Sequence, residues 1–540
     1  MPTTSGYLGL RLTRGRAIPL VCGVLLLAGC LLRLVALDRY PAPVYQEELS
    51  NIYDGYSLLE TGADRWGAHH PIVLRAFGEG DYRPGMYAWL TTVPIAVGGF
   101  SVTSGRLVSA ILGSLALVLI ALLALRLAGP EYAVAALAFA ALSPWLISFS
   151  RVAHDGATLA PFLFLLVFFL WQRASSRHFP DALLLATAFT LGLSTNSYQT
   201  ARLTAPLLGL CIAWDIVRES RKPWRALTLA AFASAAGAAP QIWVLFTDRA
   251  HFVSRAGHTL IQGDGPLDLL TKFGAGIAAN LGPKYLFSPN MRETFLTSAR
   301  LLPIEALFFS IGILTLWRLP VKETPRFRIF LYLGLLIALL PAAVTNQNPH
   351  SLRAGAFSVL APFISAAGAI ACRDWLLNRG LSRRALHATF AITLIASFAF
   401  VAYMYLGGPN PRLQRMQFGL VQATRKLPQY QRDHPRIFVE LRDIQPYMYV
   451  TAFSGMTPLQ FQRAQKEILE KNTWDVVRRV GKYFFRSSAE LHGQSCGRAS
   501  GPQSDLVLSH EPLVNIAPID SAGPASERYY FSEVESRCYR

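Results

Sequence analysis

Two adjacent carboxylates, Glu47 and Glu48, follow the first long apolar segment of the chain, and the dipeptide Arg83-Pro84 closes the same loop. Carboxylates beside a lipid-facing helix are costly, so their presence there indicates a function. A carboxylate can take the proton of an attacking hydroxyl group, and a guanidinium can grip phosphate oxygens in a bidentate manner. The residue types at the two ends of this loop therefore fit group transfer from a phosphate.

The residues after the acidic pair have the spacing of a short helix. Glu48, Ile52, Tyr56 and Leu59 recur at helical intervals, which predicts a helix that begins at Glu47-Glu48 and rests on the membrane surface. Acidic residues in a first helical turn also interact favourably with the helix dipole. Capping is therefore the competing interpretation of the pair.

The composition is that of a polytopic membrane protein. Of 540 residues, 52% are hydrophobic and only 16% are charged, and the apolar residues form long blocks. Residues 17–36 are long enough to cross a bilayer, and they follow Arg11, Arg14 and Arg16. This pattern predicts a retained first helix with a cytoplasmic N-terminus rather than a cleaved signal peptide.

The charges of the loops predict the topology, because short cytoplasmic loops collect Lys and Arg. Four loops are basic, at about residues 173–177, 218–225, 318–328 and 373–384. All four loops can lie on the cytoplasmic side only if one apolar block does not span the membrane. The best candidate is the short block 84–100, which contains Pro94 and ends in Gly-Gly. The prediction is about eleven spans in an all-α membrane domain over residues 1–406, with residues 407–540 as an exterior domain.

This topology places a set of polar residues on one face of the membrane. They are Glu47, Glu48, Arg83, Arg151, His154, Asp155, Asn196, Tyr198, Arg202, His350 and Arg353. The spans themselves are nearly free of ionisable groups, whereas an ion or proton pathway usually buries them at mid-span. The pattern indicates a site open to the exterior.

The segment from Glu47 to Trp89 resembles the polyprenyl-phosphate-sugar glycosyltransferases of the GT-C superfamily, similar to the protein O-mannosyltransferases and the aminoarabinose-lipid A transferases. The family elements are the acidic pair, LLETG (58–62), RPGMYAWL (83–90), SPWLISFSRVAHDGATL (143–159), LFSPN…LLPIEALFF (286–309) and NPHSLRAGAFSVLAPF (348–363). The first acidic residue is often Asp in the family, whereas this chain has Glu47. Either Glu47 or Glu48 can therefore be the working carboxylate.

The resemblance implies a GT-C fold on a bacterial inner membrane and an inverting transfer of a sugar from a polyprenyl phosphate to a hydroxyl group of a protein, lipid or glycan. Glu47 is assigned as the base that deprotonates the acceptor. Arg83, Arg202 and Arg353 are candidates to hold the donor phosphate, and His350 orders its loop or hydrogen-bonds that phosphate. Gly-rich nucleotide loops are absent, which fits a lipid-linked donor.

Several alternatives stay open at this point. Asp155 either pairs with Arg151 or belongs to the sugar or metal site, and Tyr198 either contacts the sugar or anchors the chain at the membrane interface. The spacing of His154, Asp155 and other histidines matches no known ligand motif, so a divalent metal is compatible with the sequence but not implied. A transporter or flippase for lipid-linked sugars, and an inactive scaffold, are the alternative functions.

The polar tail predicts a small α/β domain. Four strands are expected at 436–441, 482–487, 505–509 and 528–534, and a helix at 457–471. Cys496 and Cys538 both lie in this exported region, so they are expected to form a disulfide, whereas the other four cysteines read as free thiols. The net charge of +18 is concentrated in the cytoplasmic loops, which favours contact with membrane lipid over nucleic acid.

Overall fold

The structure is a computed structural model that describes residues 5–41, 44–255, 259–289, 299–321, 325–407, 417–442, 445–471, 474–494, 496–499, 504–536 and 538–539, without the side chains of 5–17 and 406–407. The side chains of Arg11, Arg14 and Arg16 and part of the segment 286–309 therefore lie outside the described residues.

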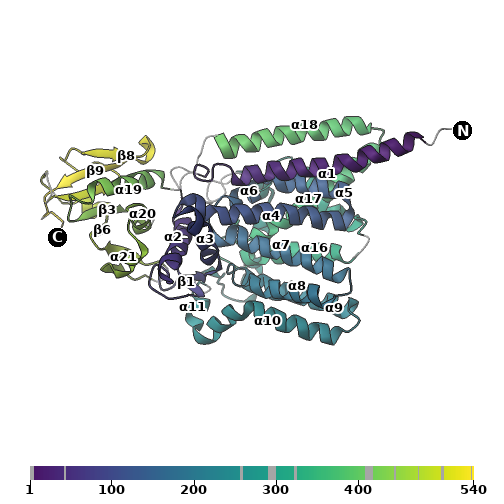
Figure 1. Cartoon of the computed structure of the whole chain (residues 1–540), viewed down its shortest axis with the longest axis horizontal. Helices are drawn as coiled ribbons and strands as arrows, with labels where there is room; N and C mark the ends of the chain where they lie inside the picture. The colour runs from purple at the N-terminus through teal and green to yellow at the C-terminus, as the bar shows by residue number, and fades with distance from the viewer. Residues whose placement is uncertain are drawn as a thin grey trace. The chain divides into compact units, whose positions relative to one another are not determined.

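The chain divides into two compact units (Figure 1). The first comprises Met1–Ala36, Ser109–Trp243 and Thr259–Pro409, and the second comprises Leu37–Val108, Val244–His258 and Asn410–Arg540. The domain boundary at residue 406 stays a prediction.

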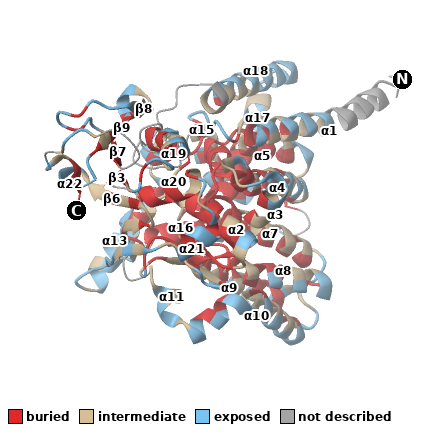
Figure 2. Cartoon of the chain, turned by 60° about the vertical axis from the view of Figure 1, so that its left-hand side comes forward, coloured by how far each residue is buried: buried red, intermediate tan, exposed pale blue. Residues whose placement is uncertain are grey.

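The first unit is a bundle of apolar helices. Its elements are α1 (Ser5–Leu34), most of α4 (Val102–Ala128), α5 (Pro130–Leu142), α6 (Pro144–Ser150), the π-helix η1 (Asp155–Leu159), α7 (Ala160–Ser175), α8 (Asp181–Ser194), α9 (Ala201–Glu219), α10 (Pro223–Thr247), α13 (Pro266–Leu281), α14 (Pro283–Phe287), α15 (Glu305–Thr315), α16 (Phe327–Ala343), α17 (Gly355–Asn378) and α18 (Arg383–Ala402). Figure 2 shows that α17 and α5 are largely buried, whereas α18 is mostly exposed. The exposed side chains of α18 include Ile392 and Ile395, as expected of a helix that faces lipid.

Within the described residues, five helices are long and apolar enough to cross a membrane, or six if the bent pair α5 and α6 forms one span. The five are Val102–Ala128, Asp155–Ser175, Pro223–Thr247, Gly355–Asn378 and Arg383–Tyr405, and shorter apolar helices include Ile18–Leu34 and Phe327–Ala343. The chain is therefore a multi-pass membrane protein, and the number of eleven spans stays a prediction.

Two glycines allow α15 and α17 to pack backbone against backbone. A Cβ atom on Gly312 would lie 1.9 Å from the carbonyl oxygen of Ile364, and one on Gly368 would lie 1.8 Å from that of Phe308. Small residues permit such close approach between membrane helices. The close packing fixes α17, whose first turn lies beside the polar residues discussed below.

The second unit contains the first large loop and the C-terminal region. The loop forms α2 (Gln46–Thr61), the antiparallel strands β1 (Val73–Arg75) and β2 (Tyr82–Pro84), and α3 (Met86–Gly98), followed later in the chain by α11 (Arg249–Val253). The predicted helix at Glu47-Glu48 is confirmed. The 13 residues of α3 extend about 20 Å, which is less than a hydrocarbon core and favours the non-spanning interpretation of block 84–100.

The C-terminal region forms one mixed sheet in the order β4-β5-β6-β3-β7-β9-β8. Strand β3 (Ile437–Leu441) runs parallel to β6 (Tyr483–Ser487) and β7 (Asp505–Ser509), and β9 (Tyr529–Val534) pairs antiparallel with β7 and with β8 (Asp520–Ala522). The four predicted strands are confirmed. The helices of this region are α19 (Phe418–Tyr430), α20 (Pro446–Phe453), α21 (Pro458–Arg463) and α22 (Ser488–His492).

The prediction of one helix over 457–471 is wrong in its second half. Helix α21 ends at Arg463, and Lys466–Leu469 forms the strand β4, which pairs antiparallel with the unpredicted strand β5 (Val476–Val480). The pairing places Ile468 opposite Val477. A cross-strand partner distant from the helix has overridden the local helical preference.

A disulfide joins Cys496 to Cys538, with their Cα atoms 5.5 Å apart. Both cysteines pack against a buried cluster that includes Phe438 and Val507. Among the described residues, Cys22, Cys30, Cys211 and Cys372 are free thiols. The disulfide therefore closes the end of the chain onto the sheet.

Candidate active site

The two predicted carboxylates have different surroundings, although they are adjacent in the first turn of α2. Glu48 is fully buried, and its two oxygens accept hydrogen bonds from Arg106 Nε at 2.9 Å and Nη2 at 3.1 Å. Its Oε1 also accepts the N–H of Tyr45 at 3.3 Å, as in a capping box. Glu47 is only partly buried. Glu48 is therefore held in an ion pair, whereas Glu47 is accessible.

Arg106, which was not among the residues predicted from the sequence, joins Glu48 to the segment that precedes α2. Its Nη1 donates to the carbonyl oxygens of Leu37 and Pro41, at 2.8 and 2.7 Å. Gly105 brings the start of α4 close to α2, since a Cβ atom there would lie 2.2 Å from Cγ1 of Ile52. The only sequence signal was a single arginine at the edge of an apolar block, 58 residues from its partner.

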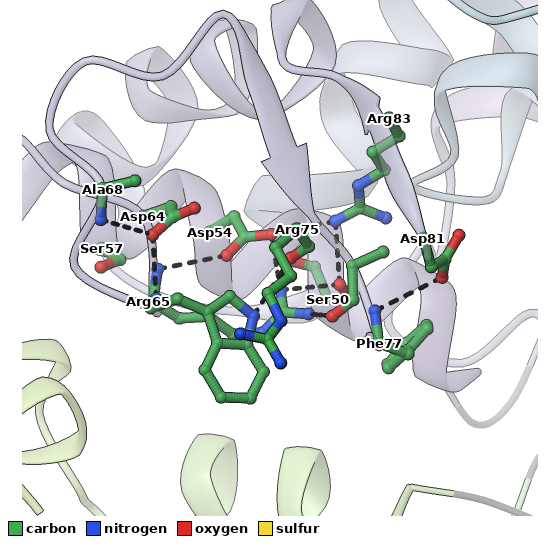
Figure 3. Close-up of polar contacts among 12 residues, drawn as sticks. Ser50, Asp54, Ser57, Asp64, Arg65, Ala68, Arg75, Phe77, Asp81 and Arg83 are labelled. Atoms are coloured by element: carbon green, nitrogen blue, oxygen red, sulfur yellow. Dashed lines mark hydrogen bonds and ion pairs between the residues drawn. The ribbon is translucent and has the colours of Figure 1, made fainter. Parts of the chain in front are cut away.

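A second buried charge network holds the loop onto the middle of α2 (Figure 3). Asp54 Oδ2 accepts hydrogen bonds from Arg65 Nη1 at 2.5 Å and from Arg83 Nη2 at 3.0 Å. Ser50, one turn earlier on α2, accepts from the same two nitrogens at 2.8 Å each. Burial has the largest effect on the pKa of Arg65 and lowers it, but the charge and hydrogen bond of Asp54 and the charges of Tyr447 and Asp64 together raise the pKa above its ordinary value.

Arg83, which the sequence suggested as a ligand of the donor phosphate, is buried against α2. It is 3% exposed, and β2 pairs with β1 so that Arg83 lies opposite Leu74. Its Nη2 donates to Asp54 and to Ser50, both on α2. The structure gives Arg83 the geometry of a residue that fastens β2 to α2.

The first unit gathers a different set of the predicted residues. His154 Nδ1 lies 2.9 Å from Oδ1 of Asp155 and 3.1 Å from the backbone nitrogen of Gly156, at the start of η1. The ring of Tyr198 packs edge-on against His154, with centroids 5.9 Å apart. A Cβ atom on Gly156 would lie 2.8 Å from the Tyr198 ring, so glycine is required for this packing.

His350 and Arg353 belong to the same group of residues. Burial, together with the positive charges of Arg353 and His154, lowers the pKa of His350 to about 3. Its backbone N–H donates to Asn280 at 3.2 Å, but its buried Nδ1 has no hydrogen-bond partner within the described part of the chain. Arg353 donates to Gln347 at 3.1 Å. A neutral imidazole with an open nitrogen thus lies beside a permanent cation.

A pocket of the first unit is lined by the starts of three helices next to this group. Its wall includes Gly156 and Pro161 from η1 and α7, Thr200 and Thr204 at the start of α9, and Leu352 before α17. Most of the lining is apolar, with hydroxyl groups on one side.

Three other predicted polar residues make contacts that tie elements of the first unit together. Arg151 donates to the carbonyl oxygens of Leu32, Val35 and Ala36 at the end of α1. Asn196 donates to Gly237 of α10, and Arg202 donates to Gln241 of the same helix at 2.9 Å. Across the described residues, no group of three or more His, Cys, Asp or Glu side chains is arranged to hold a metal ion.

One protein-family model matches a part of this sequence. Residues 82–243 match the sequence model of a family described as dolichyl-phosphate-mannose-protein mannosyltransferase. No curated protein matches the sequence with significance. The family match includes Arg83 and the segment with His154, Asp155 and Tyr198.

Two solved structures share the fold. ArnT from Cupriavidus metallidurans in the apo state is 14% identical, with a TM-score of 0.53 over 94% of this chain and 97% of that one. The apo oligosaccharyltransferase of Archaeoglobus fulgidus is 15% identical, with a TM-score of 0.50 over 81% of this chain. This chain spans 64% of the length of the archaeal protein. The same ArnT bound to undecaprenyl phosphate is 16% identical over 98% of each chain, with a TM-score of 0.45.

Proposed function

From the premise that this chain is a multi-pass membrane protein of the GT-C superfamily, which confirms the resemblance noted in its sequence, we propose that it transfers a sugar from a polyprenyl-phosphate donor to a hydroxyl group. The name of the matched family supports a lipid monophosphate donor. The acceptor is a protein, lipid or glycan, and the reaction takes place at the exterior face of a bacterial inner membrane. The N-terminus is cytoplasmic and the C-terminal region is exterior in this proposal.

One observation carries the assignment of the base: the ion pair of Glu48 with Arg106. Both oxygens of Glu48 accept hydrogen bonds from a buried guanidinium, so the carboxylate is engaged in a buried ion pair. Glu47, the next residue back, is partly exposed. We therefore assign the base to Glu47 and a structural role to Glu48.

The chemical step is a single displacement. The acceptor oxygen attacks the anomeric carbon while Glu47 takes its proton, and the bond from that carbon to the phosphate oxygen breaks. The polyprenyl phosphate leaves with the electron pair, so no acid is needed to protonate it. Attack opposite the leaving group inverts the anomeric configuration.

His350 and Arg353 are proposed to hold the donor phosphate. The pKa of His350 is lowered to about 3 by burial and by neighbouring cations, so the imidazole is neutral at pH 7 and can donate one N–H without adding charge. Arg353 supplies the permanent charge. Asp155 and Tyr198, which lie beside His154, are proposed to contact the sugar. Arg202, on α9, stays a second candidate for the phosphate.

The test is sugar transfer in membranes that contain the protein and synthetic polyprenyl-monophosphate sugars, with products read by mass spectrometry. Glu47→Gln should lower the rate about a hundredfold or more while donor binding is kept. Glu48→Gln should lower thermal stability first, because it weakens a buried ion pair. A folded Glu48→Gln protein without activity, beside an active Glu47→Gln protein, would reverse the assignment. Donor binding without release of polyprenyl phosphate would favour a transporter.

A further inference from the structure

The C-terminal region contacts both ends of the helix that carries Glu47. At the N-terminal end of α2, the backbone N–H of Gln445 donates to Oε1 of Gln46 at 2.8 Å, and the hydroxyl of Tyr449 donates to the carbonyl oxygen of Val44 at 3.2 Å. Both hydrogen bonds are buried. Both acceptors precede Glu47 in sequence: Gln46 directly, and Val44 three residues before it.

Tyr449 lies deep beside the two carboxylates. Its side chain is fully buried, and burial, followed by the nearby charges of Tyr45, Glu47 and Glu48, raises its pKa well above the ordinary value. The phenol therefore stays protonated and keeps donating to Val44 across the physiological range. A buried hydroxyl with its acceptor fixed is a rigid contact rather than a surface one.

The far end of α2 is held by a separate set of bonds. Gln462 Nε2 donates to Ser57 Oγ at 3.1 Å, to Thr61 Oγ1 at 2.9 Å and to the carbonyl oxygen of Asp64 at 2.9 Å. Thr61 is 14 residues from Glu47, which is about 20 Å along a helix. The C-terminal region thus fastens α2 at both ends, and only the fastening at the N-terminal end is close to the proposed base.

We propose that Tyr449 and Gln46 are positioning residues that hold the first turn of α2, and with it Glu47, in the geometry required for proton transfer. The proposal rests on the proposed function and deepens it, because it makes the C-terminal region a part of the catalytic apparatus. The backbone N–H of Gln445 and the hydroxyl of Tyr449 hold Gln46 and Val44, the two residues that lie one and three positions before Glu47. A misplacement of about 1 Å at a reacting group is enough to lower a rate by about a hundredfold.

The experiment uses the whole chain and two single variants. Tyr449→Phe removes one hydroxyl and keeps the ring, and Gln46→Met removes the acceptor of the Gln445 N–H. Both should lower kcat for sugar transfer about ten- to a hundredfold with KM for the donor unchanged.

Gln462→Met is the matched control, because it removes three hydrogen bonds from the same helix at its distant end. It should leave kcat within about twofold and increase hydrogen exchange of the amides near residues 57–64. Tyr449→Phe and Gln46→Met should instead increase exchange at residues 46–50. Equal losses of kcat in Gln462→Met and Tyr449→Phe, or faster exchange at 46–50 with unchanged kcat, would overturn the proposal.

Hydrogen exchange also separates this proposal from the proposed function. If the unmodified protein transfers no sugar, the proposed function fails. Faster exchange at residues 46–50 in Tyr449→Phe would still establish the fastening of α2. Unchanged exchange there in both Tyr449→Phe and Gln46→Met would overturn the positioning role whatever the activity.

Discussion

The charged groups of the two units are used in opposite ways. In the second unit, buried cations and carboxylates are matched: Arg106 pairs with Glu48, and Asp54 pairs with Arg65 and Arg83. In the first unit, burial and the neighbouring cations keep His350 neutral, with its Nδ1 open among the described residues. Matched charges stabilise a framework, whereas a permanent cation beside an open nitrogen suits an incoming anion.

This difference separates residues that look alike in sequence. Arg83 and Arg353 were both candidates for the donor phosphate because both are arginines beside a predicted span. Arg83 is 3% exposed and pairs with the carboxylate of Asp54, whereas Arg353 is half-buried and donates to the amide oxygen of Gln347. The partner, rather than the residue type, distinguishes a framework arginine from a candidate ligand.

The largest expected effect is on the stability of the second unit. Asp54→Ala leaves two buried guanidiniums without their carboxylate, so it should lower the free energy of unfolding by about 3–5 kcal/mol. Thermal unfolding in detergent measures this loss. The control is Asp181→Ala, which breaks an exposed pair with Arg225 and should leave the melting temperature nearly unchanged. Equal melting temperatures for the two variants would mean that burial does not determine how much an ion pair contributes to stability.

The next effect separates Arg83 from Arg353 directly. Arg353→Lys should raise KM for the donor about tenfold with little change in stability, because lysine cannot replace bidentate contact to phosphate. Arg83→Lys should lower the melting temperature and leave KM for the donor unchanged. Steady-state kinetics and thermal unfolding of the same preparations test both statements. A higher KM in Arg83→Lys together with a lower melting temperature in Arg353→Lys would show that Arg83 binds the donor phosphate and Arg353 stabilises the fold.

A further expected effect is a difference in the sign of the pH dependence. The pKa of His350 is lowered to about 3, so its contribution to stability is present above the unfolded pKa near 6.5 and is lost as pH falls toward 3. Burial raises the pKa of Glu527 in the second unit to about 7. Its contribution is therefore present below about pH 4.5 and is lost as pH rises through 7.

Melting temperature against pH measures these two slopes. His350→Gln should flatten the fall below pH 6.5, and Glu527→Gln should flatten the fall between pH 4.5 and 7. Glutamine is the matched replacement in both cases because it is polar and does not titrate. Unchanged slopes in both variants would mean that neither group sets the pH dependence.

Local patterns were enough to predict several elements. The spacing of Glu48, Ile52 and Tyr56 predicted α2, and short runs of apolar and aromatic residues predicted β3, β6, β7 and β9. Strand β4 was mistaken for helix because its partner β5 lies on another segment. Local preference decides an element only where no distant partner competes for it.

The sequence by itself determined that this is a multi-pass membrane chain, which motifs it carries and which residues are chemically able to act. Those properties depend on composition, spacing and residue type, and all three are local. Only the tertiary structure decided that Glu48 pairs with Arg106 and Arg83 with Asp54, because the two partners lie 58 and 29 positions apart in the sequence. Whether a charged group is available for chemistry depends on its partner, and the partner is fixed by folding.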